Sequence, residues 1–426
     1  MAQEITTLSR ARELDKEDSL AKFRSEFYIP QHNGEDIIYL CGNSLGLQPK
    51  GAANIIQQEL DNWKENGVEG HFKGIRPWMH YHKNFTSYWH DLIGAEEKEV
   101  VVMNNLTVNL HLLMLSFYRP EGARFKIIME GHAFPSDQYA VESQVRLKGY
   151  DPEDAIIEVF PREGEHYLKT EDIVAQISQA GDELALVLFS GVQYYSGQFF
   201  ALSEIAKAGH DVGAYVGFDL AHAVGNVPMK LHDWGADFAT WCSYKYLNSG
   251  PGAVSGIFVH EKFATDKTFP RLAGWWGHNE KERFKMKKGF DAIPTAEGWQ
   301  LSNAPVFSMA PHLASLELFK SAGMDNLRAK SLQLTGFLET QLKAAENYGT
   351  AFEIITPSES GARGCQLSLL FHERGKEVFD WLSQNGVIAD WREPDVIRVA
   401  PVPIYNYFED VYRFGELLTQ GLTQEI

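Results

Sequence analysis

Short apolar runs recur between residues 100 and 260 of this chain, and they constrain its fold more than any other feature. The runs are rich in β-branched and aromatic residues and do not alternate with polar ones; they are 100–103, 126–129, 155–160, 184–189, 215–220, 238–242 and 254–260. Such runs are typical of strands buried on both faces of a sheet. Helix-like stretches such as 170–178 and 203–211 lie between them. Strands that alternate with helices predict a mainly parallel sheet in a three-layer α/β domain.

The pattern changes after Asn303-Ala304-Pro305. A long amphipathic region, 309–346, precedes four strand candidates (352–355, 365–371, 387–390 and 396–399) and two helix-like stretches (379–384 and 408–422). We therefore predict a large domain at residues 51–304 and a smaller α+β domain at 305–426. Residues 1–50 end in the turn-rich segment 42–46 and are predicted to contribute to the small lobe.

Composition excludes several classes of protein. The chain has 426 residues and a net charge of −18 without a block of lysines or arginines, which argues against a nucleic-acid partner. The longest apolar stretch, 100–117, is interrupted by asparagines and a histidine, so no membrane span is expected. Residues 1–18 lack the apolar core of a signal peptide, and three cysteines without metal-site spacing fit reduced thiols. These features predict a cytoplasmic protein.

Lys245 lies between an apolar run and a glycine turn, in Ser-Tyr-Lys-Tyr-Leu-Asn-Ser-Gly-Pro-Gly. A lysine amine forms a Schiff base with an aldehyde, and a buried one also acts as a base. Asp219 ends the run Tyr-Val-Gly-Phe-Asp, so its carboxylate should emerge at the carboxyl edge of the sheet, where it could keep a pyridine nitrogen protonated. One crossover separates the two residues, which could face one cleft. Together they suggest pyridoxal phosphate (PLP), although each alone also fits a turn lysine and a helix-capping aspartate.

Other polar and aromatic side chains follow neighbouring strands. Each has a plain alternative: a packed histidine, a proline turn, a helix cap or an intramolecular ion pair. The candidates are His222 and Phe134 for stacking on the ring, Asp137 as a hydrogen-bond acceptor, Thr107, Ser190 and Tyr195 for the phosphate, and Arg398 for a substrate carboxylate.

His80 and His82 alternate in Met-His-Tyr-His and raise the question of a metal. One pair without a third nearby ligand is weak support for a site. We therefore predict no metal.

Several segments resemble the kynureninase family. They are Gly-Asn-Ser-Leu-Gly-Leu-Gln-Pro (42–49), Arg-Pro-Trp (76–78), Phe-Pro-Ser-Asp (134–137), Phe-Asp-Leu-Ala-His-Ala-Val-Gly-Asn (218–226), Leu-His-Asp-Trp-Gly-Ala-Asp-Phe-Ala (231–239), Trp-Cys-Ser-Tyr-Lys-Tyr-Leu-Asn (241–248), Gly-Trp-Trp-Gly-His (274–278) and Arg-Val-Ala-Pro-Val-Pro (398–403). The matches run in order from about residue 20 to residue 420.

This resemblance implies a fold-type-I, PLP-dependent homodimer of the class V aminotransferase group, with residues 1–50 also contributing to the dimer. It implies hydrolysis of L-kynurenine or 3-hydroxy-L-kynurenine to L-alanine and anthranilate or 3-hydroxyanthranilate, in tryptophan catabolism or NAD biosynthesis. The family pattern makes Lys245 the Schiff-base lysine, pairs Asp219 with the pyridinium and stacks Phe134 on the ring. It assigns the remaining positions as follows: cofactor contacts at Leu106, Thr107, Pro135, Ser136, Asp137, Ser190, Tyr195, His222, Tyr244, Trp275 and Asn303; substrate contacts at Ser44, His71, Asn303 and Arg398.

Trp276 departs from relatives that have Phe at this position, and it adjoins Trp275, which matches a position usually reached from the partner subunit. His71 and Asn303 supply polar groups for the aryl ring and favour 3-hydroxykynurenine. The chemistry makes Tyr244, next to the lysine, the candidate proton relay.

Two other functions remain as alternatives: a cysteine-desulfurase-like lyase, which would need a reactive thiol at Cys41, Cys242 or Cys365, and a non-catalytic PLP-binding regulator. The short acidic N-terminal segment leaves little room for a DNA-binding module.

Overall fold

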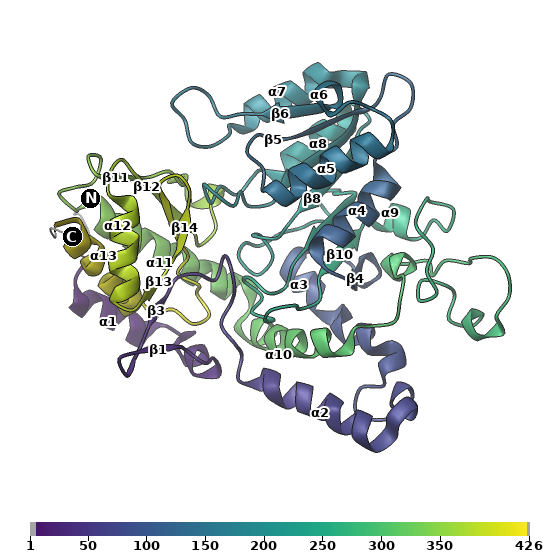
Figure 1. Cartoon of the computed structure of the whole chain (residues 1–426), viewed down its shortest axis with the longest axis horizontal. Helices are drawn as coiled ribbons and strands as arrows, with labels where there is room; N and C mark the ends of the chain where they lie inside the picture. Colours follow the sequence, from purple (N-terminus) through teal and green to yellow (C-terminus); the bar gives the residue numbers. More distant parts are fainter. Residues whose placement is uncertain (1–5, 424–426) are drawn as a thin grey trace.

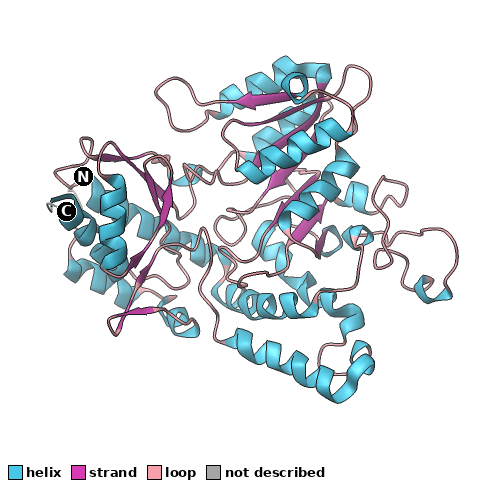
Figure 2. Ribbon diagram, viewed as in Figure 1, coloured by secondary structure: helices cyan, strands magenta, loops and turns pink. Residues whose placement is uncertain are grey.

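The computed structural model describes residues 6–423 and shows two lobes, one built around each of two larger sheets (Figures 1 and 2). The large lobe holds a seven-stranded sheet in the order β4-β10-β9-β8-β7-β5-β6. Strands β5 to β9 run parallel, whereas β10 pairs antiparallel with both β9 and β4. The strands are β4 (Val100–Val102), β5 (Lys126–Glu130), β6 (Ile156–Val159), β7 (Leu184–Ser190), β8 (Tyr215–Asp219), β9 (Phe238–Trp241) and β10 (Gly256–Val259). The predicted mainly parallel sheet is confirmed.

Helices cover both faces of this sheet, and this explains why its strands do not alternate in polarity. Neighbouring residues of one strand enter different cores: in β7, Leu186 and Leu188 face α4 and α5, whereas Val187 and Phe189 face α7 and α8. The helices of the large lobe are α2 (Gly51–Asn66), α3 (Trp89–Ile93), α4 (Leu106–Phe117), α5 (Pro135–Leu147), α6 (Pro152–Ala155), α7 (Thr170–Ala180), α8 (Leu202–Asp211), α9 (Glu261–Ala264) and α10 (Val306–Ala322). Burial on both faces therefore explains why successive positions of the central strands are apolar.

The small lobe has its own core around a four-stranded antiparallel sheet, β11-β12-β15-β14. Its elements are α11 (Met324–Lys343), β11 (Phe352–Ile354), β12 (Leu367–Phe371), α12 (Gly375–Gln384), β13 (Val387–Ile388), β14 (Asp390–Arg392), β15 (Val396–Val399) and α13 (Phe408–Thr423). The N-terminal segment joins this lobe, because β3 (Ile38–Tyr39) pairs with β13 and α1 (Leu8–Glu17) packs on α13. The α+β character predicted for this lobe is confirmed.

The boundary predicted near residue 305 falls at the start of α10. Helix α10 runs beside α2, and its apolar residues join the core under the large sheet (Figure 1). The chain turns at Gly323, whose φ is +79°, and α11 then contributes Leu334, Leu338 and Leu342 to the core of the small lobe. The domain boundary near residue 305 stays a prediction, since an apolar helix face does not show which lobe it covers.

The remaining elements are short. They are β1 (Gln31–His32) and β2 (Glu35–Asp36), and the 3-10 helices η1 (Ala21–Glu26), η2 (Gly67–His71), η3 (Trp78–Tyr88), η4 (Glu97–Glu99), η5 (Gly181–Glu183), η6 (Arg283–Lys285), η7 (Ala296–Trp299) and η8 (Ser360–Ala362). None of the helices within residues 6–423 combines the length and the apolar character that crossing a bilayer requires.

Candidate active site

A pocket opens at the carboxyl ends of β5, β7 and β8, where ligands collect in open α/β sheets. It brings together ten of the residues predicted to contact the cofactor, together with four that were not predicted. The predicted residues are Leu106, Thr107, Phe134, Ser136, Asp137, Ser190, Asp219, His222, Tyr244 and Lys245; the others are Glu130, Val192, Tyr194 and Ala221. Segments from five regions of the sequence thus converge on one site.

Lys245 and Asp219 face this pocket because they follow adjacent strands. Asp219 is the last residue of β8 and pairs in register with Thr240 of β9, and Lys245 follows the end of β9. The Lys245 Nζ lies 3.1 Å from Nε2 of His222 and 5.9 Å from the centre of the Phe134 ring. An amine, an imidazole and an aromatic ring therefore share one small volume.

Three buried carboxyl groups lie at the same edge of the sheet. Burial raises the pKa of Asp219 above its usual value, although the Ala221 N–H and the charge of Lys245 oppose this. Burial and the nearby Asp219 raise the pKa of Asp137 well above its usual value. Burial also raises the pKa of Glu130 to about 7, against the Ser190 N–H that donates to both its oxygens. Such a site disfavours further negative charge and accommodates a protonated ring nitrogen, as PLP would present.

The pocket also offers groups that suit a phosphate. Helix α4 begins at Leu106 after the N-cap Asn105, and α5 begins at Pro135, so the N-terminal ends of two helices reach the pocket. Thr107 Oγ1 lies 2.9 Å from Ser136 Oγ, and the buried Ser190 Oγ has no hydrogen-bond partner within residues 6–423. Helix N-termini and free hydroxyl groups are a common seat for phosphate. The residues present therefore fit PLP at both of its ends.

Comparison with known proteins agrees with this chemistry. A family model described as the kynureninase C-terminal domain matches residues 327–418. A curated kynureninase from Flavobacterium psychrophilum is 54% identical over 419 residues, which cover 98% of this chain and 99% of the relative. One from Mus musculus is 51% identical, covering 97% and 92% of the two chains. The chain belongs to the kynureninase family.

Solved structures with a similar fold include PLP-dependent enzymes. The apo cysteine desulfurase from Thermococcus onnurineus NA1 aligns with a TM-score of 0.75 at 18% identity, covering 94% of this chain and 97% of that structure. A C-DES mutant with glycine covalently linked to its PLP cofactor aligns with a TM-score of 0.73 at 16% identity, covering 90% and 96%. These likenesses confirm the predicted fold-type-I architecture of this member of the kynureninase family.

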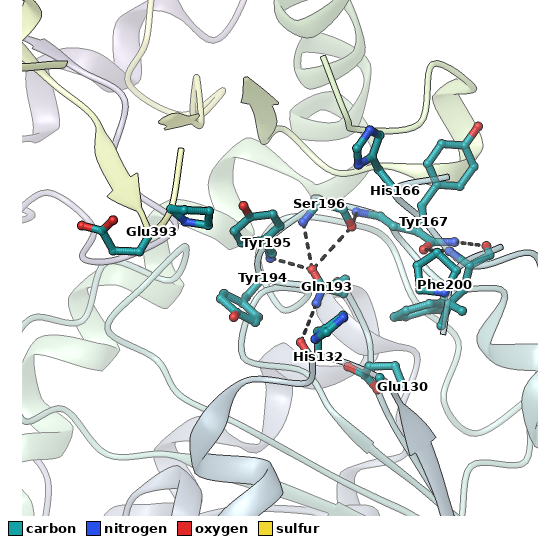
Figure 3. Close-up of a pocket in the computed structure, with 15 residues that line it drawn as sticks. Glu130, His132, His166, Tyr167, Gln193, Tyr194, Tyr195, Ser196, Phe200 and Glu393 are labelled. Atoms are coloured by element: carbon teal, nitrogen blue, oxygen red, sulfur yellow. Dashed lines mark hydrogen bonds between the residues drawn. The ribbon is translucent and has the colours of Figure 1, made fainter. Parts of the chain in front are cut away.

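Tyr195 was predicted to reach the phosphate, but Tyr194 is the tyrosine of this loop that lines the cofactor pocket. Tyr195 lines a neighbouring pocket instead, as Figure 3 shows, and Tyr194 contributes to both. The hydroxyl group of Tyr195 lies near Asp395 of the small lobe. Burial and this carboxylate raise the pKa of Tyr195 to about 12. The phosphate contact assigned to Tyr195 therefore stays a prediction.

Arg398 of β15 makes the ion pair that was the alternative to its substrate role. Its side chain is 1% exposed; Nη2 lies 2.7 Å from Asp390 Oδ2, and Nη1 donates to the Tyr194 carbonyl at 2.6 Å. Its Nε has no partner within the described residues. Arg398 therefore contacts the backbone of Tyr194, a residue that lines the cofactor pocket.

Besides Tyr195 and Arg398, five further predicted residues do not appear among the described residues that line the pocket. Pro135 starts α5 beside it, whereas Ser44, His71, Trp275 and Asn303 lie elsewhere on the chain. Trp275 is half-exposed, with its Nε1 donating to the Arg283 carbonyl, and Asn303 is exposed. Glu130 and Tyr194 were missed; Glu130 could have been found, since it ends an apolar strand as Asp219 does.

His82 has more potential metal ligands nearby than the sequence suggested. One ligand atom from each of His82, Glu280 and Glu297 lies within 4.8 Å of the others. His82 Nε2 is 3.0 Å from Glu297 Oε2, and Lys83 Nζ is 2.8 Å from Glu280 Oε1, so both carboxylates already have a side-chain partner. A third potential ligand is therefore present, contrary to the argument from the sequence. The absence of a metal stays a prediction.

Proposed function

We propose that this chain is a PLP-dependent enzyme that hydrolyses the Cβ–Cγ bond of L-kynurenine, 3-hydroxy-L-kynurenine or both. The products are L-alanine and anthranilate or 3-hydroxyanthranilate. The observation that carries the proposal is the convergence of Lys245, Asp219 and His222 on one pocket of a chain that is 54% identical to a curated kynureninase. The activity belongs to tryptophan catabolism or NAD biosynthesis, and we place the protein in the cytoplasm.

PLP, when bound at Lys245, supplies an electron-poor ring that accepts the electron pair left at the substrate Cα. The Lys245 amine would remove the proton from Cα and return it before alanine is released, and the Asp219 carboxylate would keep the ring nitrogen protonated. Water adds to the γ-carbonyl carbon, and the Cβ–Cγ bond breaks, with the aryl fragment leaving as its carboxylic acid. The electron pair of that bond goes to Cβ, which receives a proton through Tyr244 as the relay.

Substrate orientation is assigned to Arg398 at one end and to polar side chains at the other. The buried guanidinium of Arg398 suits the α-carboxylate because it offers planar donors, and its Nε remains unpaired within residues 6–423. Ser44, His71 and Asn303 are proposed to surround the aromatic end. A hydrogen-bonding imidazole and amide there would accommodate the hydroxyl group of 3-hydroxykynurenine.

We propose that the enzyme works as a homodimer whose sites include residues from both subunits. His71, Trp275 and Asn303 are not among the residues that line the pocket of their own chain, which is expected if they complete the pocket of a second subunit. Large exposed apolar side chains lie in the same segments: Leu60, Trp63, Val68, Phe72, Ile75, Leu272, Phe284, Met286, Phe290 and Phe307. An apolar surface of this kind favours burial against another copy.

A cysteine desulfurase is disfavoured by the state of the three thiols. Burial raises the pKa of Cys41 and of Cys365 to about 12, and it also raises the pKa of Cys242. Thiols with raised pKa values carry little thiolate at neutral pH and make poor nucleophiles. Within residues 6–423, the likeness to desulfurases therefore extends to the fold and not to a reactive cysteine.

One assay tests the proposal. The purified protein is supplied with PLP and then with kynurenine or 3-hydroxykynurenine, and kcat/KM is measured for each from the fluorescence of the anthranilate product. Lys245→Ala should lower kcat by at least about 10³-fold, because it removes both the cofactor attachment and the base. Lys207→Ala, at an exposed lysine on α8 paired with Asp211, is the matched control. Full activity in Lys245→Ala, or sulfide release from cysteine without anthranilate formation, would refute the proposal.

A further inference from the structure

Gln193 lies in the loop after β7, and its side-chain amide is the centre of a hydrogen-bond network (Figure 3). Its Oε1 accepts from the backbone N–H of Tyr195 at 2.6 Å and of Ser196 at 2.9 Å, and from Ser196 Oγ at 3.4 Å. Its Nε2 donates to the His132 carbonyl at 3.1 Å. The residue is 7% exposed, so these contacts are made away from water. One buried side chain thus joins two separate segments of the large lobe.

Both segments carry an aromatic ring that lines the cofactor pocket. His132 has a left-handed backbone with φ of +56° and precedes Phe134 by two residues, and Tyr194 directly follows Gln193. The rings of Phe134 and Tyr194 meet edge to face, with centres 5.2 Å apart and planes at 81°. Because Gln193 bonds the backbone beside each ring, it sets the position of one ring relative to the other.

The small lobe holds the same loop from the other side. Arg398 Nη1 and Gln366 Nε2 donate to the Tyr194 carbonyl at 2.6 and 3.0 Å. Ser368 Oγ donates to the Tyr195 carbonyl at 2.5 Å, and Thr356 Oγ1 donates to the Ser196 carbonyl at 2.6 Å. The small lobe therefore binds the carbonyl groups of three consecutive residues, while Gln193 binds the N–H groups of two of them.

We propose that Gln193 is a positioning residue for the cofactor, which holds the rings of Phe134 and Tyr194 in the arrangement that PLP binds. The proposal rests on the proposed function, since PLP is the ligand that these rings would contact. Removal of the amide leaves two N–H groups and one carbonyl group without their partners in a buried place. The loop after β7 must then shift or admit water. The backbone segments that carry the two rings are then no longer joined by hydrogen bonds to one side chain.

The test compares Gln193→Ala with Gln198→Ala in the full-length apoprotein. Gln198 lies in the same loop, is 6% exposed, and its side chain instead bonds the backbone N–H and carbonyl of Leu168 at 3.0 and 2.6 Å. Both variants should lower the Tm of the apoprotein to a similar extent. Fluorescence titration with PLP should show Kd raised about tenfold in Gln193→Ala and changed less than about twofold in Gln198→Ala.

A third variant, Gln193→Glu, keeps an acceptor for Tyr195 and Ser196 but places a carboxylate oxygen against the His132 carbonyl. It should weaken PLP binding about as much as Gln193→Ala does, which assigns the effect to the link with the Phe134 segment. PLP affinity equal to wild type in both Gln193 variants, or an equal loss in Gln198→Ala, would overturn the proposal. A wild type that binds PLP but does not cleave either kynurenine would reject the proposed activity while leaving the role of Gln193 intact.

Discussion

The amine of Lys245 lies 3.1 Å from Nε2 of His222, at the carboxyl edge of the large sheet. Burial, together with the positive charges of Lys245, Arg398 and Arg392, lowers the pKa of His222 well below its usual value. The imidazole is therefore neutral at physiological pH, and its Nε2 can accept a hydrogen bond from the lysine. A neutral acceptor leaves the amine free to react while holding it in place.

Replacement of His222 by phenylalanine should reveal this relationship. The ring that could stack in the pocket is kept, but the acceptor for the Lys245 amine is lost. We expect kcat/KM for kynurenine to fall about tenfold, the order expected for one lost hydrogen bond at the reacting group. The same substitution at His90, an exposed histidine of α3, is the control and should leave kcat/KM unchanged. Wild-type activity in His222→Phe would show that this contact has no catalytic consequence.

The two buried aspartates should respond differently to the same substitution. Burial and the nearby Asp219 raise the pKa of Asp137 well above its usual value and so favour its neutral form, which Asp137→Asn resembles in charge and shape. In contrast, Asp219→Asn removes the charge that faces the ring nitrogen. We expect kcat to fall more than about 100-fold in Asp219→Asn and less than about threefold in Asp137→Asn. Steady-state kinetics at saturating PLP checks both values, and equal losses would contradict the assignment of charge.

Much of this arrangement could be predicted from the sequence because it depends on local pattern. An apolar run that ends in a polar residue identifies both a buried strand and the side chain at its carboxyl edge, as Asp219 and Lys245 illustrate. The choice between Tyr194 and Tyr195 could not be made in this way. The two residues are adjacent in a loop without periodicity, and Gln366 and Ser368, which bond their carbonyl groups, lie far away in the sequence.

Contacts between segments far apart in sequence were also beyond prediction. Gln193 shows no pattern that reveals its bond to the His132 carbonyl, since buried glutamines serve many structural roles. The amphipathic pattern of α10 predicted a helix but not the lobe it covers, because packing on α2 decides this. In each case the missing information is tertiary, and the residue type alone allows several outcomes.

His312 should make the stability of the protein sensitive to mild acid. Burial lowers its pKa to about 3, its Nδ1 lies 2.7 Å from Ser249 Oγ, and its ring stacks on Phe85. The unfolded chain binds a proton at this histidine below about pH 6.5, whereas the folded chain does not until about pH 3. The contribution of neutral His312 to stability is therefore fully present above about pH 6.5, and it is lost progressively as the pH falls from there toward about 3.

Protonation of His312 in the unfolded chain should lower the free energy of unfolding at pH 5 by about 2 kcal/mol relative to pH 7.5. Urea denaturation at both pH values measures the difference. His312→Asn keeps a polar atom toward Ser249 but cannot be protonated, so its loss of stability between the two pH values should be smaller than that of wild type by this amount. Equal losses in the two proteins would mean that His312 is not kept neutral by the fold.

The proposed sharing of sites between subunits predicts that two inactive variants restore each other. Lys245→Ala lacks the lysine in its own pocket, and Trp275→Ala lacks a side chain that we assign to the pocket of the second subunit. When the two are unfolded together and refolded as an equal mixture, about half of the dimers are mixed, and each has one site with both residues intact. Activity should then reach about a quarter of the wild-type value, well above that of either variant refolded alone. A mixture no more active than the mean of the two variants would place Trp275 in the pocket of its own chain or outside the site altogether.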